Sequence, residues 1–203
     1  MGVTHPPGAV LALFEETGAY LRGHFRLTSG LHSGEYLQCA RVLRFPGYAE
    51  RFGRDLAARL TPLAGAVPEL VVSPALGGLI IGHEVARALG TPFLFTERDA
   101  ASGKMTLRRG FTIEPGQTAI VIEDVITTGG STREVVDLIR AAGGRVLAAG
   151  SIIDRSGGEA EAGVPRVALA TLHPVTWQPE ECPLCAQGLE IQKPGSRVVP
   201  AAR

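Results

Sequence analysis

Residues 118–132 read Thr-Ala-Ile-Val-Ile-Glu-Asp-Val-Ile-Thr-Thr-Gly-Gly-Ser-Thr, and this stretch decides the fold. An apolar run ends in two adjacent acids, Glu123 and Asp124, and a loop of Thr, Gly and Ser follows from 127 to 131. Apolar residues then recur at helical spacing and predict a helix over about 132–142. The order strand, acidic pair, glycine-rich turn and helix directs backbone N–H groups and a helix N-terminus at one point, which favours phosphate binding.

Two carboxylates beside a phosphate site are electrostatically unfavourable unless the ligand also has a group that binds them. Ribose hydroxyls, or a Mg²⁺ bound to a diphosphate, would be such groups. A ligand with a phosphate at one end and a diol in the middle fits both features. The alternative is an ordinary turn between a strand and a helix, with acids that only aid solubility. The sequence has neither G-x-x-x-x-G-K-[ST] nor G-x-G-x-x-G after a strand, so nucleotide-binding loops of those two kinds lack their main support.

Composition indicates a globular protein with one core. The 203 residues are 45% apolar and 20% charged, which is ordinary for a soluble domain. The 20 basic and 20 acidic residues balance, so no net field draws the chain to nucleic acid or to a membrane, and we expect neither as a partner. The first residues do not resemble a signal peptide or a membrane span, and a cytoplasmic location is expected.

Three cysteines are present, and two of them form Cys182-Pro-Leu-Cys185. Such a pair can be half of a zinc site, a redox pair, or without either role. No second Cys/His pair stands at metal spacing, and Cys39 is remote in the sequence. A zinc ion shared between two copies of the chain is one arrangement that would complete a site, although no protein metal ligand is assigned.

From residue 70 onward the pattern alternates between strands and helices. Strands are predicted at 70–73, 93–95, 118–122, 145–153 and 166–171, with helices at 79–89 and 132–142 between them. This alternation predicts an α/β protein with a parallel sheet and helices on both faces. Ligands bind beyond the carboxyl ends of such strands. The loop at 127–131, the turn at 74–78, the segment after 95 and the pair 154–155 should therefore border one crevice.

The two ends of the chain show a different pattern. Helices are predicted at about 8–19 and 48–60, with an irregular segment at 25–38 between them, and little periodicity follows Pro174. We expect residues 1–45 and 174–203 to pack together as a cap on a core of about 48–173, within a single domain of residues 1–203.

The stretch 118–132 resembles the phosphoribosyl-diphosphate (PRPP) signature of type I phosphoribosyltransferases. The resemblance implies that family's α/β fold, in which a central, mostly parallel sheet is flanked by helices and covered by a small cap, or hood, from the chain ends. It implies that Glu123 and Asp124 contact the ribose hydroxyls, directly or through Mg²⁺, and that the loop holds the 5-phosphate. Mg²⁺ would arrive with the diphosphate rather than in a protein cage. The implied PRPP-binding residues are Glu123, Asp124, Val125, Ile126, Thr127, Thr128, Gly129, Gly130 and Ser131.

A second segment, residues 97–110, is polar and cationic. It follows a predicted strand and contains Gly103 and Gly110, which could act as hinges, so it is interpreted as a mobile lid that closes on the diphosphate. Arg98 and Lys104 are its candidate catalytic residues. In the family the lid reaches into the neighbouring subunit's site, which implies a homodimer with the 97–110 lid acting in trans. The alternative is a solvated hairpin whose cations only aid solubility.

Three further features resemble orotate phosphoribosyltransferases: the segment Thr-Ser-Gly-Leu-His-Ser-Gly-Glu-Tyr at 28–36, the pair Asp154-Arg155, and Thr127. The resemblance implies contacts to orotate from Ser29, Gly30, Thr127 and Arg155. A planar guanidinium suits a carboxylate better than a lysine would. The implied reaction transfers ribose 5-phosphate from PRPP to orotate, giving orotidine 5-phosphate and diphosphate, in the biosynthesis of the pyrimidine nucleotide UMP.

The chain also departs from that family's pattern. Leu76-Gly77-Gly78 stands where many members carry Tyr-Lys, and the lid lacks the usual Arg-Lys pair and histidine. Two other interpretations remain: a phosphoribosyltransferase for a purine, against which the Ser-Gly segment and Arg155 stand, and a PRPP-sensing regulator of nucleic acid, against which the balanced charge stands.

Overall fold

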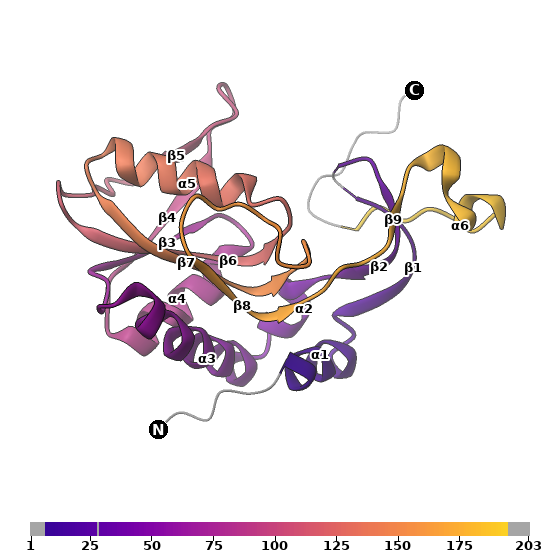
Figure 1. Cartoon of the computed structure of the whole chain (residues 1–203), viewed down its shortest axis with the longest axis horizontal. Coiled ribbons are helices and arrows are strands. Elements are labelled where there is room, and N and C mark those ends of the chain that lie inside the picture. Colours follow the sequence, from indigo (N-terminus) through magenta and orange to yellow (C-terminus); the bar gives the residue numbers. More distant parts are fainter. Residues whose placement is uncertain (1–6, 28, 195–203) are drawn as a thin grey trace.

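A six-stranded sheet forms the centre of the computed structural model, which describes residues 7–27 and 29–194 (Figure 1). The strand order is β5-β4-β3-β6-β7-β8, and every neighbouring pair is parallel except β4 and β5. The prediction of an α/β fold with a mostly parallel sheet is thus confirmed. The strands are β3 (Leu70–Pro74), β4 (Phe93–Arg98), β5 (Met105–Leu107), β6 (Thr118–Ile126), β7 (Arg145–Asp154) and β8 (Arg166–Thr171).

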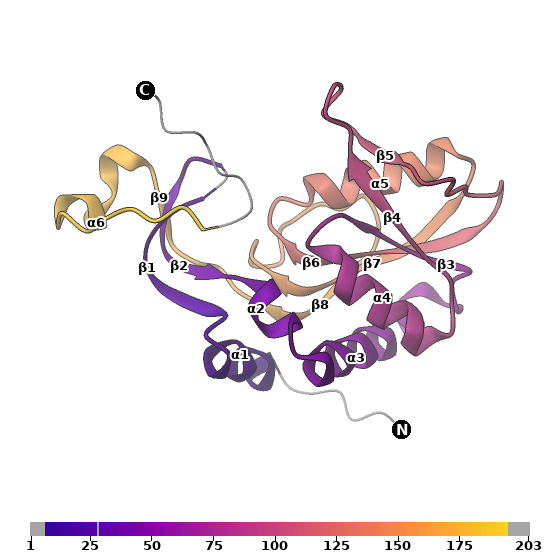
Figure 2. The same ribbon diagram turned by 180° about the vertical axis from the view of Figure 1, so that it is seen from behind.

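Helices cover both faces of this sheet. Helices α3 (Pro46–Ala64) and α4 (Gly78–Leu89) lie on one face, and α5 (Gly130–Ala141) lies on the other (Figures 1 and 2). Successive residues of β6 alternate between the two cores: Ile120 packs with the α3 and α4 side, and Val121 packs with the α5 side. Because both faces of the strand are buried, the strand is a continuous apolar run rather than an alternating one.

Beside the core lies a small three-stranded antiparallel sheet, made of β1 (Tyr20–Arg26), β2 (His32–Leu37) and β9 (Thr176–Trp177). The short helices η1 (Pro179–Glu181) and α6 (Pro183–Ala186) follow β9. We call this sheet together with residues 178–194 the hood. It projects to one side of the core and joins segments from both ends of the chain (Figure 1).

The prediction that residues 25–38 are irregular was wrong. This segment contributes the end of β1 and all of β2, which pair with a register shift between Arg22 and Phe25. Gly, Ser and His interrupt the apolar alternation here, because the hairpin is stabilised by β9 and by polar contacts rather than by a broad apolar face.

Helix α1 (Pro7–Glu16) falls within the range predicted for the cap, yet its side chains join the core. Val10 and Phe14 belong to the same apolar cluster as Phe52 of α3, and the Phe14 and Phe52 ring centroids are 6.3 Å apart. The helix ends at Glu16 rather than at 19, because Gly18 takes a left-handed φ of 63° and the Ala19 N–H returns to the Phe14 carbonyl. Helix α2 (Cys39–Leu43) then joins the hood to α3.

Within residues 7–27 and 29–194, none of the helices has both the length and the apolar character required to span a bilayer.

Candidate active site

The acidic pair lies inside β6, because this strand continues to Ile126 instead of ending at 122. Ile126 pairs with Asp154 at the end of β7, and the backbone N–H of Arg155 donates to the Ile126 carbonyl at 2.8 Å. The carboxyl ends of β3, β4, β6 and β7 therefore meet at one edge of the sheet, as the order of strands and helices predicts.

Glu123 and Asp124 point in opposite directions, as neighbours in a strand must. Glu123 is buried and faces the first turn of α5, where it accepts hydrogen bonds from Ser131 Oγ at 2.6 Å and from Thr132 Oγ1. Asp124 faces the opposite side and lines two neighbouring cavities. The two predicted ribose ligands thus have different surroundings: Glu123 holds the loop after β6 to the strand, and Asp124 faces the two cavities.

Burial raises the pKa of Glu123 to about 7, although the two hydroxyl donors oppose this shift. Burial also raises the pKa of Asp124. Both carboxyls have therefore lost solvent that would stabilise their charge, and a positive group in the site would favour their ionised forms.

The raised pKa of Glu123 predicts how stability depends on pH. A group whose pKa is higher in the folded state stabilises the fold fully below its unfolded value of about 4.5, and this contribution is lost as the pH rises through about 7. Between about pH 5 and pH 9 the free energy of unfolding should fall by about 3 kcal/mol from this group, by the relation of about 1.4 kcal/mol per unit. Urea unfolding of the ligand-free protein at several pH values measures this fall.

Glu123→Gln should remove that pH dependence, whereas Glu114→Gln, at an exposed position, should retain it. Equal pH slopes for wild type and Glu123→Gln would show that the carboxyl is not the group responsible.

The loop from Thr127 to Ser131 turns tightly at Gly129, which has a left-handed φ of 83° and precedes the first turn of α5. A Cβ at Gly129 would lie 2.8 Å from the Glu161 carbonyl oxygen, so only glycine fits here. Arg133 Nη2 donates to the same carbonyl at 2.8 Å and holds the facing segment in place. Thr127, Thr128 and Gly130 line a cavity of about 740 Å³ at the N-terminus of α5. The predicted phosphate loop therefore has the geometry that anion binding requires.

A second cavity, of about 460 Å³, lies between the hood and the core. Ser29 and Tyr36 reach it from the hood, and Asp124, Thr127 and Arg155 reach it from the core. A third cavity, of about 320 Å³, shares Tyr36, Gln38 and Asp124 with the second and extends to the loop at 76–77. The first and second cavities also share lining residues, so the three cavities are neighbours, and together we call them the groove.

Of the predicted orotate ligands, Ser29, Thr127 and Arg155 line this groove together. Gly30 lies in the same hood loop with a left-handed φ of 91°, where it returns the chain into β2. Sequence analysis did not single out Tyr36 and Gln38, because it did not predict the strand β2 that carries Tyr36 to the groove.

Arg155 has an unusual environment. Its Nε atom is buried and has no hydrogen-bond partner in the described part of the chain, and burial lowers the pKa of the guanidinium. Its neighbour Asp154 does not compensate for this, since that carboxylate accepts from Arg166 and from Ser156 Oγ instead. A buried donor without an acceptor calls for an explanation, and an anionic ligand in the groove would supply one.

The loop at 74–78, which lacks the family's Tyr-Lys, lies against Asp124. A Cβ at Gly77 would lie 2.5 Å from Asp124 Oδ1, so the backbone here approaches the carboxylate as closely as glycine permits. The Ala75 N–H donates to the Thr96 carbonyl at 2.8 Å and ties the loop to β4. The loop contributes Leu76 and Gly77 to the third cavity, and it brings no cationic side chain to that end of the groove.

The segment 97–110 forms a β-hairpin in which Arg98 opposes Met105. Arg98 makes a two-pronged ion pair with Glu134 of α5, with N–O distances of 3.0 and 3.2 Å. Lys104 is exposed near the tip of the hairpin. Residues 97–110 do not line the three cavities of their own chain. Figure 1 shows the hairpin projecting beyond the core on the side where α5 lies.

Comparison with known proteins gives consistent results. Residues 49–181 match the family model described as "Phosphoribosyl transferase domain". The chain is 53% identical over 188 residues to the orotate phosphoribosyltransferase of Heliobacterium modesticaldum, covering 93% of this chain and 97% of that one. It is 54% identical over 190 residues to the protein of the same name from Pelotomaculum thermopropionicum, covering 94% and 97%.

The solved structures agree. The crystal structure of orotate phosphoribosyltransferase from Aeropyrum pernix matches with a TM-score of 0.66 and 27% identity, covering 80% of this chain and 93% of that one. The groove, the phosphate loop and these relatives together show that the chain belongs to the orotate phosphoribosyltransferases, within the phosphoribosyl transferase domain family.

Proposed function

We propose that the protein transfers the ribose 5-phosphate group of PRPP to a ring nitrogen of orotate, releasing diphosphate and forming orotidine 5-phosphate, a step of pyrimidine (UMP) biosynthesis. The observation that carries this proposal is Arg155, whose buried Nε has no hydrogen-bond partner in the described structure and which shares a cavity with Ser29 and Thr127. Orotate carries a carboxylate, and a guanidinium can bind a carboxylate through two parallel hydrogen bonds.

The groove suggests how the two substrates lie. The 5-phosphate would take the N–H groups of the loop from Thr127 to Ser131, and the base would lie between Arg155 and the hood loop. The ribose would then lie beside Asp124, which lines the second and third cavities. As diphosphate leaves, positive charge develops on the ribose, and a carboxylate fixed nearby stabilises that charge without having to reorganise.

Magnesium fits this arrangement. Asp124 offers a carboxyl group at the groove, and a divalent cation nearby would favour its ionised form, which burial alone disfavours. Mg²⁺ carried by PRPP would neutralise charge on the leaving diphosphate. The chain's own contribution is to orient the diphosphate through the backbone at 76–77 and to hold Asp124 in place through the N–H of Val125 at 2.9 Å.

The lid would act in trans in a homodimer. Within one chain, Arg98 is paired with Glu134 and the hairpin stands off the groove. Lys104, exposed near the hairpin tip, would reach the diphosphate of a neighbouring subunit and supply the cation that the loop at 76–78 lacks. Arg98 would have to leave Glu134 to do the same.

An absorbance assay tests the proposed activity. With purified protein, PRPP and Mg²⁺, orotate should be consumed, and its absorbance should fall in proportion to the diphosphate released. Adenine, guanine and hypoxanthine should give no diphosphate above the rate without base. Turnover with a purine and none with orotate would reject the assignment of the base and leave only the phosphoribosyltransferase fold.

A further inference from the structure

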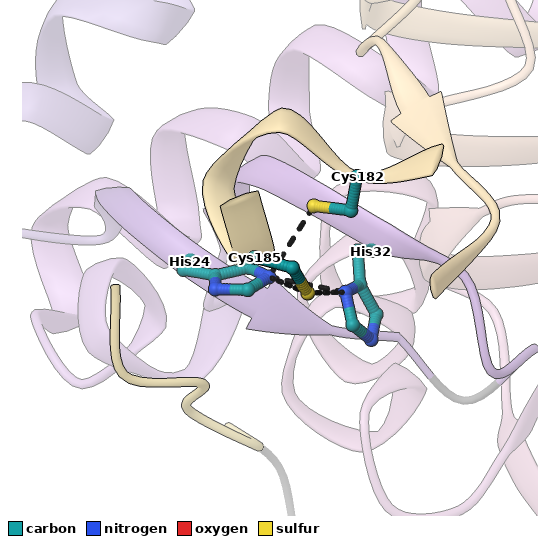
Figure 3. A group of neighbouring side chains, drawn as sticks. All are labelled: His24, His32, Cys182 and Cys185. Atoms are coloured by element: carbon teal, nitrogen blue, oxygen red, sulfur yellow. Dashed lines mark hydrogen bonds between the residues drawn. The ribbon is translucent and has the colours of Figure 1, made fainter. Parts of the chain in front are cut away.

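Two histidines and two cysteines meet in the hood, and none of the four lines the three cavities of the groove (Figure 3). His24 lies on β1 and His32 on β2, while Cys182 and Cys185 stand at the start of α6 and within it. One ring nitrogen from each histidine and both sulfur atoms all lie within 4.8 Å of one another. His24, His32 and Cys182 are buried, and Cys185 lies on the solvent side.

We propose that these four residues form a structural zinc site within one chain. The distance from His24 Nε2 to His32 Nδ1 is 3.0 Å, and the distance from Cys182 Sγ to His24 Nε2 is 3.4 Å. Cys185 Sγ lies 3.4 Å from His32 Nδ1 and 3.7 Å from His24 Nε2. In a tetrahedral zinc site, Zn–N bonds of about 2.0 Å and Zn–S bonds of about 2.3 Å place neighbouring ligand atoms about 3.3–3.8 Å apart. The cluster therefore needs only small adjustments to hold zinc.

The orientation of His24 supports this assignment. Its Nδ1 lies 2.9 Å from the backbone carbonyl oxygen of Leu189, which can only accept a hydrogen bond. Nδ1 therefore carries the proton, and Nε2 directs a lone pair into the cluster. Histidines that bind metals are commonly fixed in this way, with the second ring nitrogen donating to a backbone carbonyl.

The chain around the cysteines has little else to hold it. Among residues 178–194, Cys182 alone is buried, and the apolar side chains of Leu189 and Ile191 are exposed. The two apolar core clusters contain no residue of this segment. Backbone hydrogen bonds join Gln192 to His24 and Arg26 of β1. A metal that ties this segment to β1 and β2 would stabilise it, because the free energy of metal binding then contributes directly to folding.

The ligand set also indicates which metal. Four protein ligands leave no open position for a substrate, which is typical of structural rather than catalytic zinc, and two thiolates with two imidazoles in tetrahedral array suit zinc. Sequence analysis found no partner for the C-x-x-C pair and considered a zinc ion shared between two copies. The two histidines, which stand on neighbouring strands of a hairpin, make a second copy unnecessary.

Metal content tests the proposal and does not depend on enzymatic activity. The full-length protein, produced with zinc in the medium and passed over a desalting column, should contain one zinc ion per chain by mass spectrometry. Cys182→Ser and His24→Gln should each lower this content at least tenfold. Cys39→Ser and His83→Gln are matched controls, since neither residue belongs to the cluster, and both should keep one zinc ion.

Two measurements on the wild-type chain keep the test decisive if a variant fails to fold. Cobalt(II) added to the zinc-free protein should give the visible bands of a tetrahedral thiolate site. Limited proteolysis of the zinc-free protein should cut within residues 178–194, and zinc should suppress these cuts. The proposal is overturned if zinc and cobalt do not bind, if a Cys182→Ser/Cys185→Ser protein keeps its zinc, or if the native thiols prove to be joined as a Cys182–Cys185 disulfide.

Discussion

Asp124→Asn is expected to lower kcat/KM for PRPP by about 10²–10³-fold, the usual range for removing one fixed electrostatic contact to a transition state. The substitution keeps the shape of the side chain and removes only its charge. Asp124 lines both cavities that would hold the ribose, so the developing positive charge would lose its nearest carboxylate. Steady-state rates measured at saturating orotate with varied PRPP give this number.

Asp124→Asn should not lower the stability of the folded state. Because burial raises the pKa of Asp124, its charge is not a source of stability, and the thermal midpoint of Asp124→Asn should equal or exceed that of wild type at neutral pH. Asp137→Asn, on the exposed face of α5, is the matched control and should leave the kinetics unchanged. Wild-type kinetics in Asp124→Asn would mean that the carboxylate has no part in the reaction.

The same variant tests whether the lid acts in trans. Asp124→Asn and Lys104→Ala would each be inactive alone, but in a mixed dimer one of the two sites would combine an intact Asp124 with an intact lid. Random exchange of subunits should restore about a quarter of the wild-type rate. A lid that acts within its own subunit would give no recovery in the mixture.

Arg155→Lys is expected to raise KM for orotate, lowering kcat/KM for orotate by about 10²-fold while KM for PRPP changes little. The Nε atom of Arg155 is buried and has no hydrogen-bond partner in the described part of the chain, and the backbone N–H of Arg155 donates to the Ile126 carbonyl. Lysine keeps the positive charge but not the planar pair of donors that a carboxylate accepts. Initial rates over a range of orotate concentrations, at saturating PRPP, measure the effect.

Arg140→Lys, on the outer surface of α5, is the control for this substitution and should behave as wild type. If Arg155→Lys raised KM for PRPP instead, the guanidinium would belong to the phosphate end of the groove, and the placement of the base would be wrong.

The local sequence pattern was sufficient to predict most strands and helices of the core. The strand that begins at 118, the glycine-rich loop and the helix after it were all predicted, although the strand runs to 126 and not to 122. Strands β3 and β8 were predicted to within a residue. These features depend on side-chain periodicity and on turn geometry, which are properties of consecutive residues. The sequence alone thus determined the α/β fold and located the phosphate loop.

Contacts between distant residues decided the rest. Glu123 and Asp124 are adjacent, yet only the packing of α5 on β6 shows that Glu123 holds Ser131 while Asp124 faces the groove. His24 and Cys182 are 158 positions apart, and residues 25–38, which hold His32, were predicted to be irregular because the hairpin lacks a broad apolar face. Such a contact forms only when the whole chain folds, because the elements between the two residues must bring the ends of a long loop together. The sequence therefore predicted a cap made of both chain ends, whereas the strand pairing inside it and its four-residue cluster became visible only in the tertiary structure.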